Sequence, residues 1–465
     1  MTYKEFIDSK LLVKTNNVLN IDKSELNNTL FDYQKDLVVW ALKLGKSAIF
    51  ADTGLGKTFM QLEWARIINE KKNKPVLIVA PLAVTSQTQD EALKLNLHIK
   101  YVKEQSECIN GINITNYERL DKFESDYFIG IVLDESSILK SFTGVYKKLL
   151  IDNFKNTEFK LACSATPAPN DYMELGNHSE FLNVMNLTEM LSMFFVHDGG
   201  DTSHWRLKGH AVERFWEWVS SWSAIIKNPS DLGYDGEKHK LPELIENDII
   251  IQSDNYNNNN NMLFSMPANT LDERRLAQKN SFKDRIKKTV EIVKSNPDEQ
   301  WLIWCNYNDE ANELKKLLSE SVNVQGSDEP EIKAKNLLSF GKGEIKYLIT
   351  KPKIASFGLN WQSCHNVIFC SLNDSYEQYY QSIRRCYRFG QKNKVNVYRV
   401  LSYDEINILD NIERKHNEFQ YMQKKMSIYT KKYVRENLQV KFKEMDKSYN
   451  PQIEIKLPEW LVSEE

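Results

Sequence analysis

Residues 47–58 read SAIFADTGLGKT, an apolar stretch that runs directly into a loop with two glycines. An amphipathic stretch, 59–68, follows this loop. The order of strand, loop and helix is that of a phosphate-binding loop. Gly54 and Gly56 allow the backbone to curl so that its N–H groups can point at phosphate oxygens. The stretch therefore predicts an α/β fold with a nucleotide site at the end of a strand.

The side chains of the loop carry its polar chemistry. The ammonium group of Lys57 can neutralise the β and γ phosphates, and the hydroxyl of Thr58 can bind magnesium. Thr53 and Leu55 flank the first glycine, so we expect both to contact the same ligand. A chance glycine turn is the alternative, but it does not explain the strand before the loop and the helix after it.

A second apolar stretch, YFIGIVL at 127–133, runs into the acidic pair Asp134 and Glu135. An acidic pair at the end of a buried strand suits a nucleotide hydrolase. Asp134 would hold magnesium, directly or through water, and Glu135 would polarise the attacking water. A simple turn is the alternative, and the phosphate loop upstream favours the hydrolase.

Composition sets the class of protein. The chain has 465 residues, of which 41% are hydrophobic and 27% are charged. These values are typical of a globular protein with about two to three domains. The formal net charge is −3, so any nucleic-acid-binding surface must be a local stripe.

Three features of the sequence predict a cytoplasmic protein. No apolar run approaches the ~18 residues that a membrane-spanning helix needs. The first ten residues, MTYKEFIDSK, contain acids and lack the apolar core of a signal peptide. The six cysteines form no Cys-x-x-Cys pair, which argues against a zinc ribbon and for a reducing compartment.

Two α/β units are predicted, because apolar strands alternate with helical patterns, as in parallel sheets that helices cover on both faces. The expected strands of the first unit are 48–51, 76–80, 112–115, 128–133 and 161–165. Those of the second unit, which has no phosphate loop, are 301–305, 322–324, 347–350, 367–370 and 395–400.

The chain divides into four parts: a nucleotide-binding lobe (1–175), a helical insertion and linker (176–282), a second lobe (283–402) and a helical extension (403–465). Aromatic side chains are frequent in the insertion, and we interpret them as its core rather than as a base-stacking platform. Within the extension, 411–443 holds nine basic side chains and three acidic ones. A solvated helix face and a DNA-backbone contact both explain this charge.

Residues 381–391, QSIRRCYRFGQ, resemble the arginine-finger motif of superfamily-two helicases, in the form seen in Swi/Snf-type ATPases. Further stretches resemble motifs of this family and stand in its order: FDYQ at 31–34, APL at 80–82, TNY at 115–117, SATP at 164–167 with Asn170, and SFGLN at 356–360. The likeness covers about residues 30–400. It implies two RecA-like lobes, ATP and magnesium as cofactors, and DNA as the partner.

Some positions depart from the family pattern. The acidic box reads DESS at 134–137, where many relatives have DEAH, and 372–374 lacks the usual Trp-Asn-Pro. Asp52 and Thr53 stand where Swi/Snf proteins usually have Glu-Met. The chain is most similar to the compact Swi/Snf-like helicases of bacteriophages and prophages.

The resemblance implies an ATP site that is split between the lobes. Arg385 and Arg388 would reach the phosphates from the second lobe, on one face of a helix over 376–388, and Arg384 would point away from that face. The resemblance further assigns ATP contacts to Gln34, which would read the adenine edge, and to Gly358 and Asn360. It assigns DNA contacts to Pro81, Thr115, Asn116 and Thr350.

Three functions remain open at this point. The first is an ATP-driven translocase on duplex DNA. The second is a strand-separating helicase of replication or recombination that acts from single-stranded DNA. The third is a non-catalytic clamp that ATP opens and closes, and the presence of Glu135, Arg385 and Arg388 argues against it.

Overall fold

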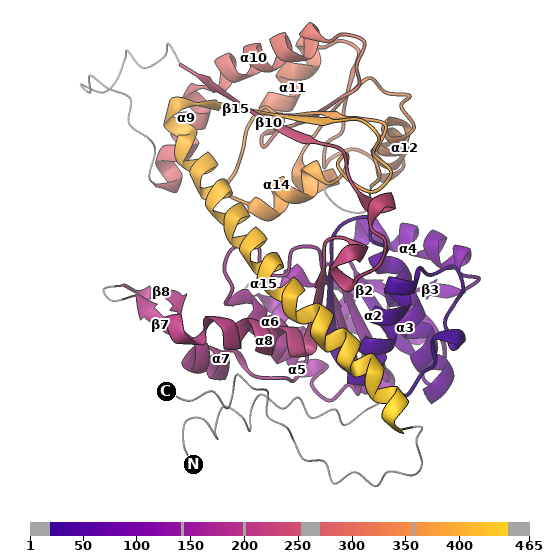
Figure 1. The fold of residues 1–465 in the computed structure, drawn as a ribbon. Helices are drawn as coiled ribbons and strands as arrows, with labels where there is room; N and C mark the ends of the chain where they lie inside the picture. The colour runs from indigo at the N-terminus through magenta and orange to yellow at the C-terminus, as the bar shows by residue number, and fades with distance from the viewer. Residues whose placement is uncertain (1–18, 141–143, 199–200, 253–269, 356–358, 445–465) are drawn as a thin grey trace.

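The computed structural model describes residues 19–140, 144–198, 201–252, 270–355 and 359–444. Two sheets, one of seven strands and one of six, form the centres of two lobes (Figure 1). Within both sheets all the strand pairings of the described residues are parallel. The predicted α/β class with two parallel-sheet, RecA-like lobes is confirmed.

The sheet of the first lobe has the strand order β3-β4-β2-β5-β6-β1-β9. Its strands are β1 (Lys46–Ala51), β2 (Val76–Ala80), β3 (Ile99–Tyr101), β4 (Ile112–Asn116), β5 (Gly130–Asp134), β6 (Phe159–Cys163) and β9 (Ser223–Ile226). Its helices are α2 (Asp32–Leu44), α3 (Lys57–Lys72), α4 (Leu82–Lys94), α5 (Val145–Asn153), α6 (Glu174–Phe181), α7 (Leu187–Phe194) and α8 (Val212–Trp222). The central strands are buried along their whole length, because helices cover both faces of the sheet.

The sheet of the second lobe has the order β10-β15-β14-β11-β13-β12. Its strands are β10 (Leu244–Ile251), β11 (Trp301–Trp304), β12 (Ser321–Asn323), β13 (Tyr347–Thr350), β14 (Asn366–Phe369) and β15 (Val395–Ser402). Its helices are α9 (Leu271–Asn280), α10 (Phe282–Ser295), α11 (Asn308–Leu317), α12 (Pro330–Gly341), α13 (Pro352–Ala355) and α14 (Tyr376–Ile383). All ten strands that the sequence predicted are present within a few residues of their expected ends.

The stretch 176–282 contributes more than helices and a linker. β9 pairs with β1 and extends the first sheet, and β10 pairs with β15 and extends the second. A separate antiparallel hairpin joins β7 (Phe195–Asp198) and β8 (Asp201–Leu207). Most of the aromatic side chains are buried, as expected of a core: Phe194, Phe195, Phe215, Trp216, Trp218 and Trp222. The asparagine run 257–261 lies outside the described residues.

One long helix, α15 (Ile406–Glu444), runs from the second lobe along the first (Figure 1). The hydroxyl of Tyr172 donates to the carbonyl of Glu418, 2.8 Å away, and the N–H of Ile225 donates to the hydroxyl of Thr430, 3.1 Å away. Some of its basic side chains are paired within the chain, since Lys425 and Lys432 contact Glu213 and Glu217. Part of the basic charge of α15 is therefore neutralised by acidic side chains of α8.

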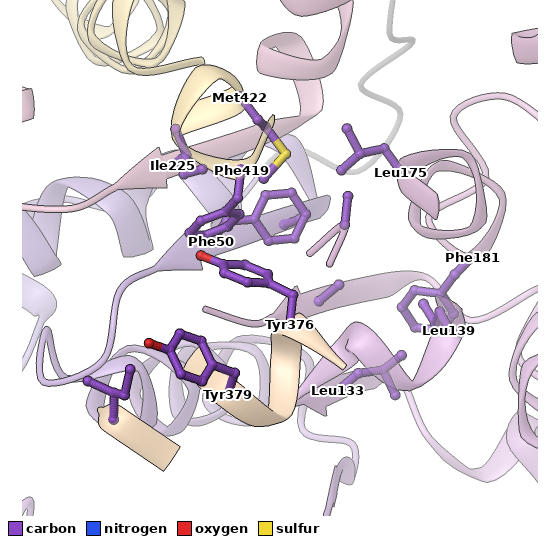
Figure 2. Packing of buried hydrophobic residues seen from close by; sticks show 14 of the residues in the cluster. Phe50, Leu133, Leu139, Leu175, Phe181, Ile225, Tyr376, Tyr379, Phe419 and Met422 are labelled. Carbon is purple, nitrogen blue, oxygen red and sulfur yellow. The ribbon is translucent and has the colours of Figure 1, made fainter. Parts of the chain in front are cut away.

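Apolar packing is continuous between the lobes. Tyr376 of α14, with Phe419 and Met422 of α15, belongs to the same buried cluster as Phe50 and Ile225 of the first sheet (Figure 2). Because burial of apolar area is the main favourable contribution to folding, this cluster stabilises the lobes against each other.

Two expectations about the environment can be compared with the structure. Among the described residues, no helix combines the length and the apolar character that a bilayer crossing requires. All six cysteines are free thiols, and only Cys108 is not fully buried.

Candidate active site

The loop between β1 and α3 has the geometry of a phosphate-binding loop. Gly54 and Gly56 have φ angles of +85° and +74°, which side chains rarely allow. A Cβ atom at Gly56 would lie 2.3 Å from Nε2 of Gln34, so this position requires glycine for space as well. The N-terminus of α3 begins at Lys57 and faces the loop, where its free N–H groups favour an anion.

Lys57 begins α3, after the loop that follows β1, and Asp134 is the last residue of β5 in the same sheet. The ammonium group of Lys57 donates to the carbonyl of Ala51 over 2.8 Å. Burial lowers the pKa of Lys57, while the charges of Glu135 and Asp134 oppose this shift. Nε2 of Gln61 donates to Oδ1 of Asp134 over 2.7 Å, and burial raises the pKa of Asp134. The structure thus places Lys57 close enough to Asp134 for each charge to affect the pKa of the other, and their shared role at a nucleotide stays a prediction.

Glu135 is held in an unusual backbone conformation, with φ of +52°. The other non-glycine residues with positive φ among those described are asparagines, which tolerate it. Burial raises the pKa of Glu135 to about 7, and Asp134 adds to this rise, whereas Lys57 and Arg385 oppose it. A strained acid with a pKa near neutrality suits a group that accepts a proton from water.

The arginines of the second lobe follow α14 rather than lie on it. The helix ends at Ile383, so the expected helix over 376–388 was too long. Arg385 and Arg388 nevertheless share a direction, because Nη1 of each donates to the carbonyl of Leu359 over 3.1 Å. Burial lowers the pKa of Arg385 to about 9, and the nearby charge of Glu135 opposes this shift. Arg385, the expected finger arginine, and Glu135, the expected catalytic acid, thus come from different lobes and affect each other's pKa.

Gln34 occupies a different position from the one expected of a free adenine-reading group. Its Nε2 donates to the carbonyl of Leu55 over 3.0 Å, and its Oε1 accepts from the N–H of Phe31 over 2.9 Å. The amide thus supports the phosphate loop in this structure. Thr53 keeps a buried hydroxyl without a partner among the described residues, as a ligand-binding group would. Adenine recognition by Gln34 stays a prediction.

The side chains assigned to DNA are mostly internal. The hydroxyls of Thr115 and Thr350 donate to the carbonyls of Val102 and Val324 over 2.9 and 3.0 Å. Asn116 is 3% exposed and accepts from the hydroxyl of Tyr101. Pro81 caps the N-terminus of α4 and is partly exposed. Thr115, Asn116 and Thr350 thus offer no exposed side chain here, and DNA contact at these positions stays a prediction.

Two further assignments belong to the loop 356–360. Gly358 lies outside the described residues. Asn360 is exposed, and the neighbouring Leu359 supplies the carbonyl that both Arg385 and Arg388 bind. Asn170 donates to Glu174 and accepts from Lys415 of α15 over 3.0 Å, so this first-lobe motif touches the long helix directly.

Sequence reasoning missed several polar residues at this site. Asp52 accepts hydrogen bonds from Tyr380 and Arg384 of the second lobe, so Arg384 points at the phosphate loop, away from the direction that Arg385 and Arg388 share. His178 lies 3.1 Å from the hydroxyl of Ser136, and burial lowers its pKa to about 4, so the ring is neutral. The one signal for Asp52 was its departure from the family pattern. Nothing in the sequence pointed to His178.

The residues present fit a magnesium ion that arrives with a triphosphate. Mg²⁺ prefers oxygen ligands and is usually held by one or two carboxylates together with substrate phosphates. Asp134 and Thr58 supply a carboxylate and a hydroxyl beside the phosphate loop. Within the described part of the chain, no group of three His, Cys, Asp or Glu side chains forms a metal site of its own.

Two family models match the chain, the first in the N-terminal lobe and the second in the C-terminal lobe. The model of the SNF2-related domain matches residues 33–197. The model of the helicase conserved C-terminal domain matches residues 284–390. The two matched regions contain the phosphate loop and acidic pair on one side and the finger arginines on the other.

Individual relatives are more distant. Nucleoside triphosphatase I of Amsacta moorei entomopoxvirus is 28% identical over 206 residues, which is 37% of this chain and 29% of that protein. A fragment of a putative HsdR subunit of a type I restriction enzyme from Vibrio vulnificus has a TM-score of 0.55 at 15% identity, over 84% of this chain and 68% of that one. A Sulfolobus solfataricus SWI2/SNF2 ATPase core in complex with dsDNA has a TM-score of 0.42 at 17% identity, over 90% and 98%. The structural likeness to the restriction-enzyme fragment supports the fold.

Proposed function

We propose that this chain, an SNF2-type nucleoside triphosphatase with a helicase C-terminal domain, is an ATP-driven motor that moves along DNA. One observation carries the proposal. Arg385 of the second lobe lies close enough to Glu135 of the first to affect its pKa, so hydrolysis depends on how the lobes are placed. A site divided in this way links each turnover to a relative movement of two bodies.

The residues of the first lobe bind the triphosphate and prepare the water. The N–H groups around Gly54 and Gly56 hold the phosphates, and Lys57 neutralises them. Thr58 and Asp134 would hold magnesium, which would neutralise phosphate charge when bound. Glu135 orients the attacking water and accepts its proton, for which a pKa of about 7 is well suited.

The second lobe supplies the charge that the transition state needs. Arg385 and Arg388 stabilise the charge that spreads over the transferred phosphoryl group. Arg385 is buried and Arg388 is partly buried, and burial lowers the pKa of both guanidinium groups. A charge with little surrounding water acts more strongly on a nearby charge. Turnover requires the closed arrangement of the lobes, and product release permits opening. When the lobes alternately close and open, the DNA-binding surface of one lobe moves along the DNA relative to that of the other lobe.

DNA is proposed as the track because the chain has an SNF2-related domain and because the motifs stand in the family's order. Contacts to phosphates rather than to base edges would make binding tolerant of sequence and strongly dependent on salt. A translocase on duplex DNA is our first choice, and a strand-separating helicase is the alternative. We further propose that the chain is of the compact Swi/Snf-like type found in bacteriophages and prophages, because its motifs resemble theirs.

The proposal is tested by measuring ATP turnover without nucleic acid and with single-stranded DNA, duplex DNA or RNA. A duplex translocase predicts stimulation by duplex DNA at least as strong as by single strands. Stimulation by single strands alone, with unwinding of a forked duplex, would favour the helicase. Equal turnover under all four conditions would contradict both forms of the DNA proposal.

A further inference from the structure

One face of α14 is docked on the first lobe through polar contacts. Glu377, Tyr380 and Arg384 are three and four residues apart, so they project from the same side of the helix and its C-terminal cap. Glu377 pairs with Lys140, which follows the acidic box. Tyr380 and Arg384 both bind the carboxylate of Asp52, at the start of the phosphate loop. The helix therefore touches both catalytic segments of the first lobe.

The contact at Asp52 is buried between the lobes. The side chains of Asp52 and Arg384 are 2% and 7% exposed. The hydroxyl of Tyr380 donates to Oδ1 of Asp52 over 2.6 Å, and the N–H of Thr53 donates to the same oxygen over 2.7 Å. The Arg384 guanidinium also lies over the rings of Tyr380 and Tyr387, at 5.2 and 5.3 Å from their centroids. Removal of one partner would leave a buried charge uncompensated, so the contact favours one relative placement of the lobes.

The position of this pair in the chain gives the contact a consequence for catalysis. Asp52 follows Ala51, whose carbonyl binds the ammonium group of Lys57. Arg384 directly precedes Arg385, the residue whose charge affects Glu135. Fixing Asp52 against Arg384 therefore fixes the start of the phosphate loop against the segment that carries both finger arginines.

We propose that Asp52, Tyr380 and Arg384, with the Lys140–Glu377 pair beside them, form an interlobe latch that positions Arg385 and Arg388 for hydrolysis. These latch residues act through the finger arginines. The inference rests on the proposed function only in requiring that the site hydrolyse ATP, and it does not require DNA. The latch closes when Asp52 meets Arg384 and opens when the lobes separate.

A double-mutant cycle tests the latch. Asp52→Asn and Arg384→Met should each lower kcat for ATP by about tenfold or more, with the Kd for ATP changed less than about threefold. The double variant should lose no more than the worse single variant, because both changes break one contact. Tyr380→Phe removes only the hydroxyl that donates to Asp52, so it should give a smaller loss of the same kind. Lys72→Gln, which breaks the ion pair with Glu158 inside the first lobe, is the control and should leave kcat unchanged.

Two results of the cycle would overturn the latch. One is multiplication of the two single losses in the double variant, which would show independent roles. The other is a weaker Kd for ATP with kcat unchanged, which would make Asp52 a nucleotide-binding residue instead.

Small-angle scattering of the full chain without nucleotide or DNA separates the latch from the proposed function. The Asp52→Asn/Arg384→Met variant should be more expanded than the wild type, and the Lys72→Gln control should not. An unchanged radius of gyration would contradict the latch. Absence of ATP turnover in the wild type would contradict the proposed function, while the scattering comparison would still decide the latch.

Discussion

The two lobes are built on the same kind of sheet but carry different chemistry at the edge where their strands end. In the first lobe, β1 leads into a loop with two positive-φ glycines, and β5 leads into the acidic pair. In the second lobe, β13 ends at Thr350, whose hydroxyl donates to the carbonyl of Val324 in the same lobe. The second lobe instead presents arginines from the turns after α14. The two lobes therefore share the architecture of this edge, and the loops at the edge set their proposed roles: the first lobe binds ATP and the second activates hydrolysis.

The largest expected effect comes from removing a group of the binding half. Lys57→Ala should abolish tight ATP binding, because it removes the charge that neutralises the phosphates. Glu135→Gln should keep ATP binding and lower turnover by roughly 10³-fold or more, because only proton acceptance is lost. Turnover and nucleotide affinity of the purified variants check this. Glu70→Gln, an exposed acid of α3, is the control, and normal turnover by Glu135→Gln would make the catalytic assignment wrong.

The activating half should give a loss of similar size and different type. Arg385→Ala or Arg388→Ala should lower kcat by roughly 10³-fold with little change in ATP affinity, since both act on the transition state. Steady-state kinetics and equilibrium binding of ATP measure the two quantities. Arg275→Ala, an exposed arginine of α9, should behave like the wild type. If the variants instead lost affinity for ATP while kcat stayed unchanged, these arginines would bind the ATP ground state and not the transition state.

A smaller effect is expected where the two halves touch. A Cβ atom at Gly54 would lie 2.9 Å from Cβ and 3.0 Å from the backbone N of Phe389 in the second lobe. Gly54→Ala also strains a φ of +85°, so turnover should fall by roughly tenfold or more. Gly209→Ala is the matched control, because a Cβ atom there meets nothing within 4 Å. Equal turnover of the two variants would show that the lobes do not meet at this loop.

The smallest effect concerns the stability of the first lobe rather than its chemistry. Lys160 is fully buried in β6, and burial lowers its pKa to about 7. An unfolded lysine keeps its proton up to about pH 10.4, so between pH 7 and 10 the unfolded chain binds more protons and stability rises with pH. Lys160→Met should remove this rise, which amounts to at most about 1.4 kcal/mol per pH unit.

Urea unfolding of the wild type and Lys160→Met at pH 7 and pH 9 measures the difference in slope. The variant leaves the carbonyl of Phe181 without its donor, 2.8 Å away, so the pH dependence is the informative quantity and not the stability at one pH. Identical pH dependence in both proteins would show that Lys160 keeps its ordinary pKa.

Much of the fold could be predicted because buried parallel strands are short apolar runs that a sequence displays directly. VLIVA at 76–80 and YLIT at 347–350 form β2 and β13 with the expected ends. β9 and β10 escaped prediction, because β9 has four residues and β10 alternates in burial at the edge of its sheet. Both join sheets whose other strands lie far away in the sequence, which local patterns do not reveal.

The short motifs of the candidate site could be read from the sequence, whereas its long-range contacts could not. Spacing alone located the glycines, Lys57 and the acidic pair, since each belongs to one short motif. The contact between Asp52 and Arg384 joins residues that are 332 positions apart, so no local pattern predicts it. Burial of Thr115 and Thr350 likewise depends on how neighbouring strands pack.

The central claim is that hydrolysis at a site shared by two lobes drives movement along DNA. Displacement of a triplex-forming strand from duplex DNA tests this most directly, because the strand is removed only if the protein moves along the duplex. The account predicts ATP-dependent displacement by the wild type and none by Glu135→Gln, which still binds ATP. Displacement by Glu135→Gln, or DNA-stimulated ATP turnover by the wild type without displacement, would contradict it.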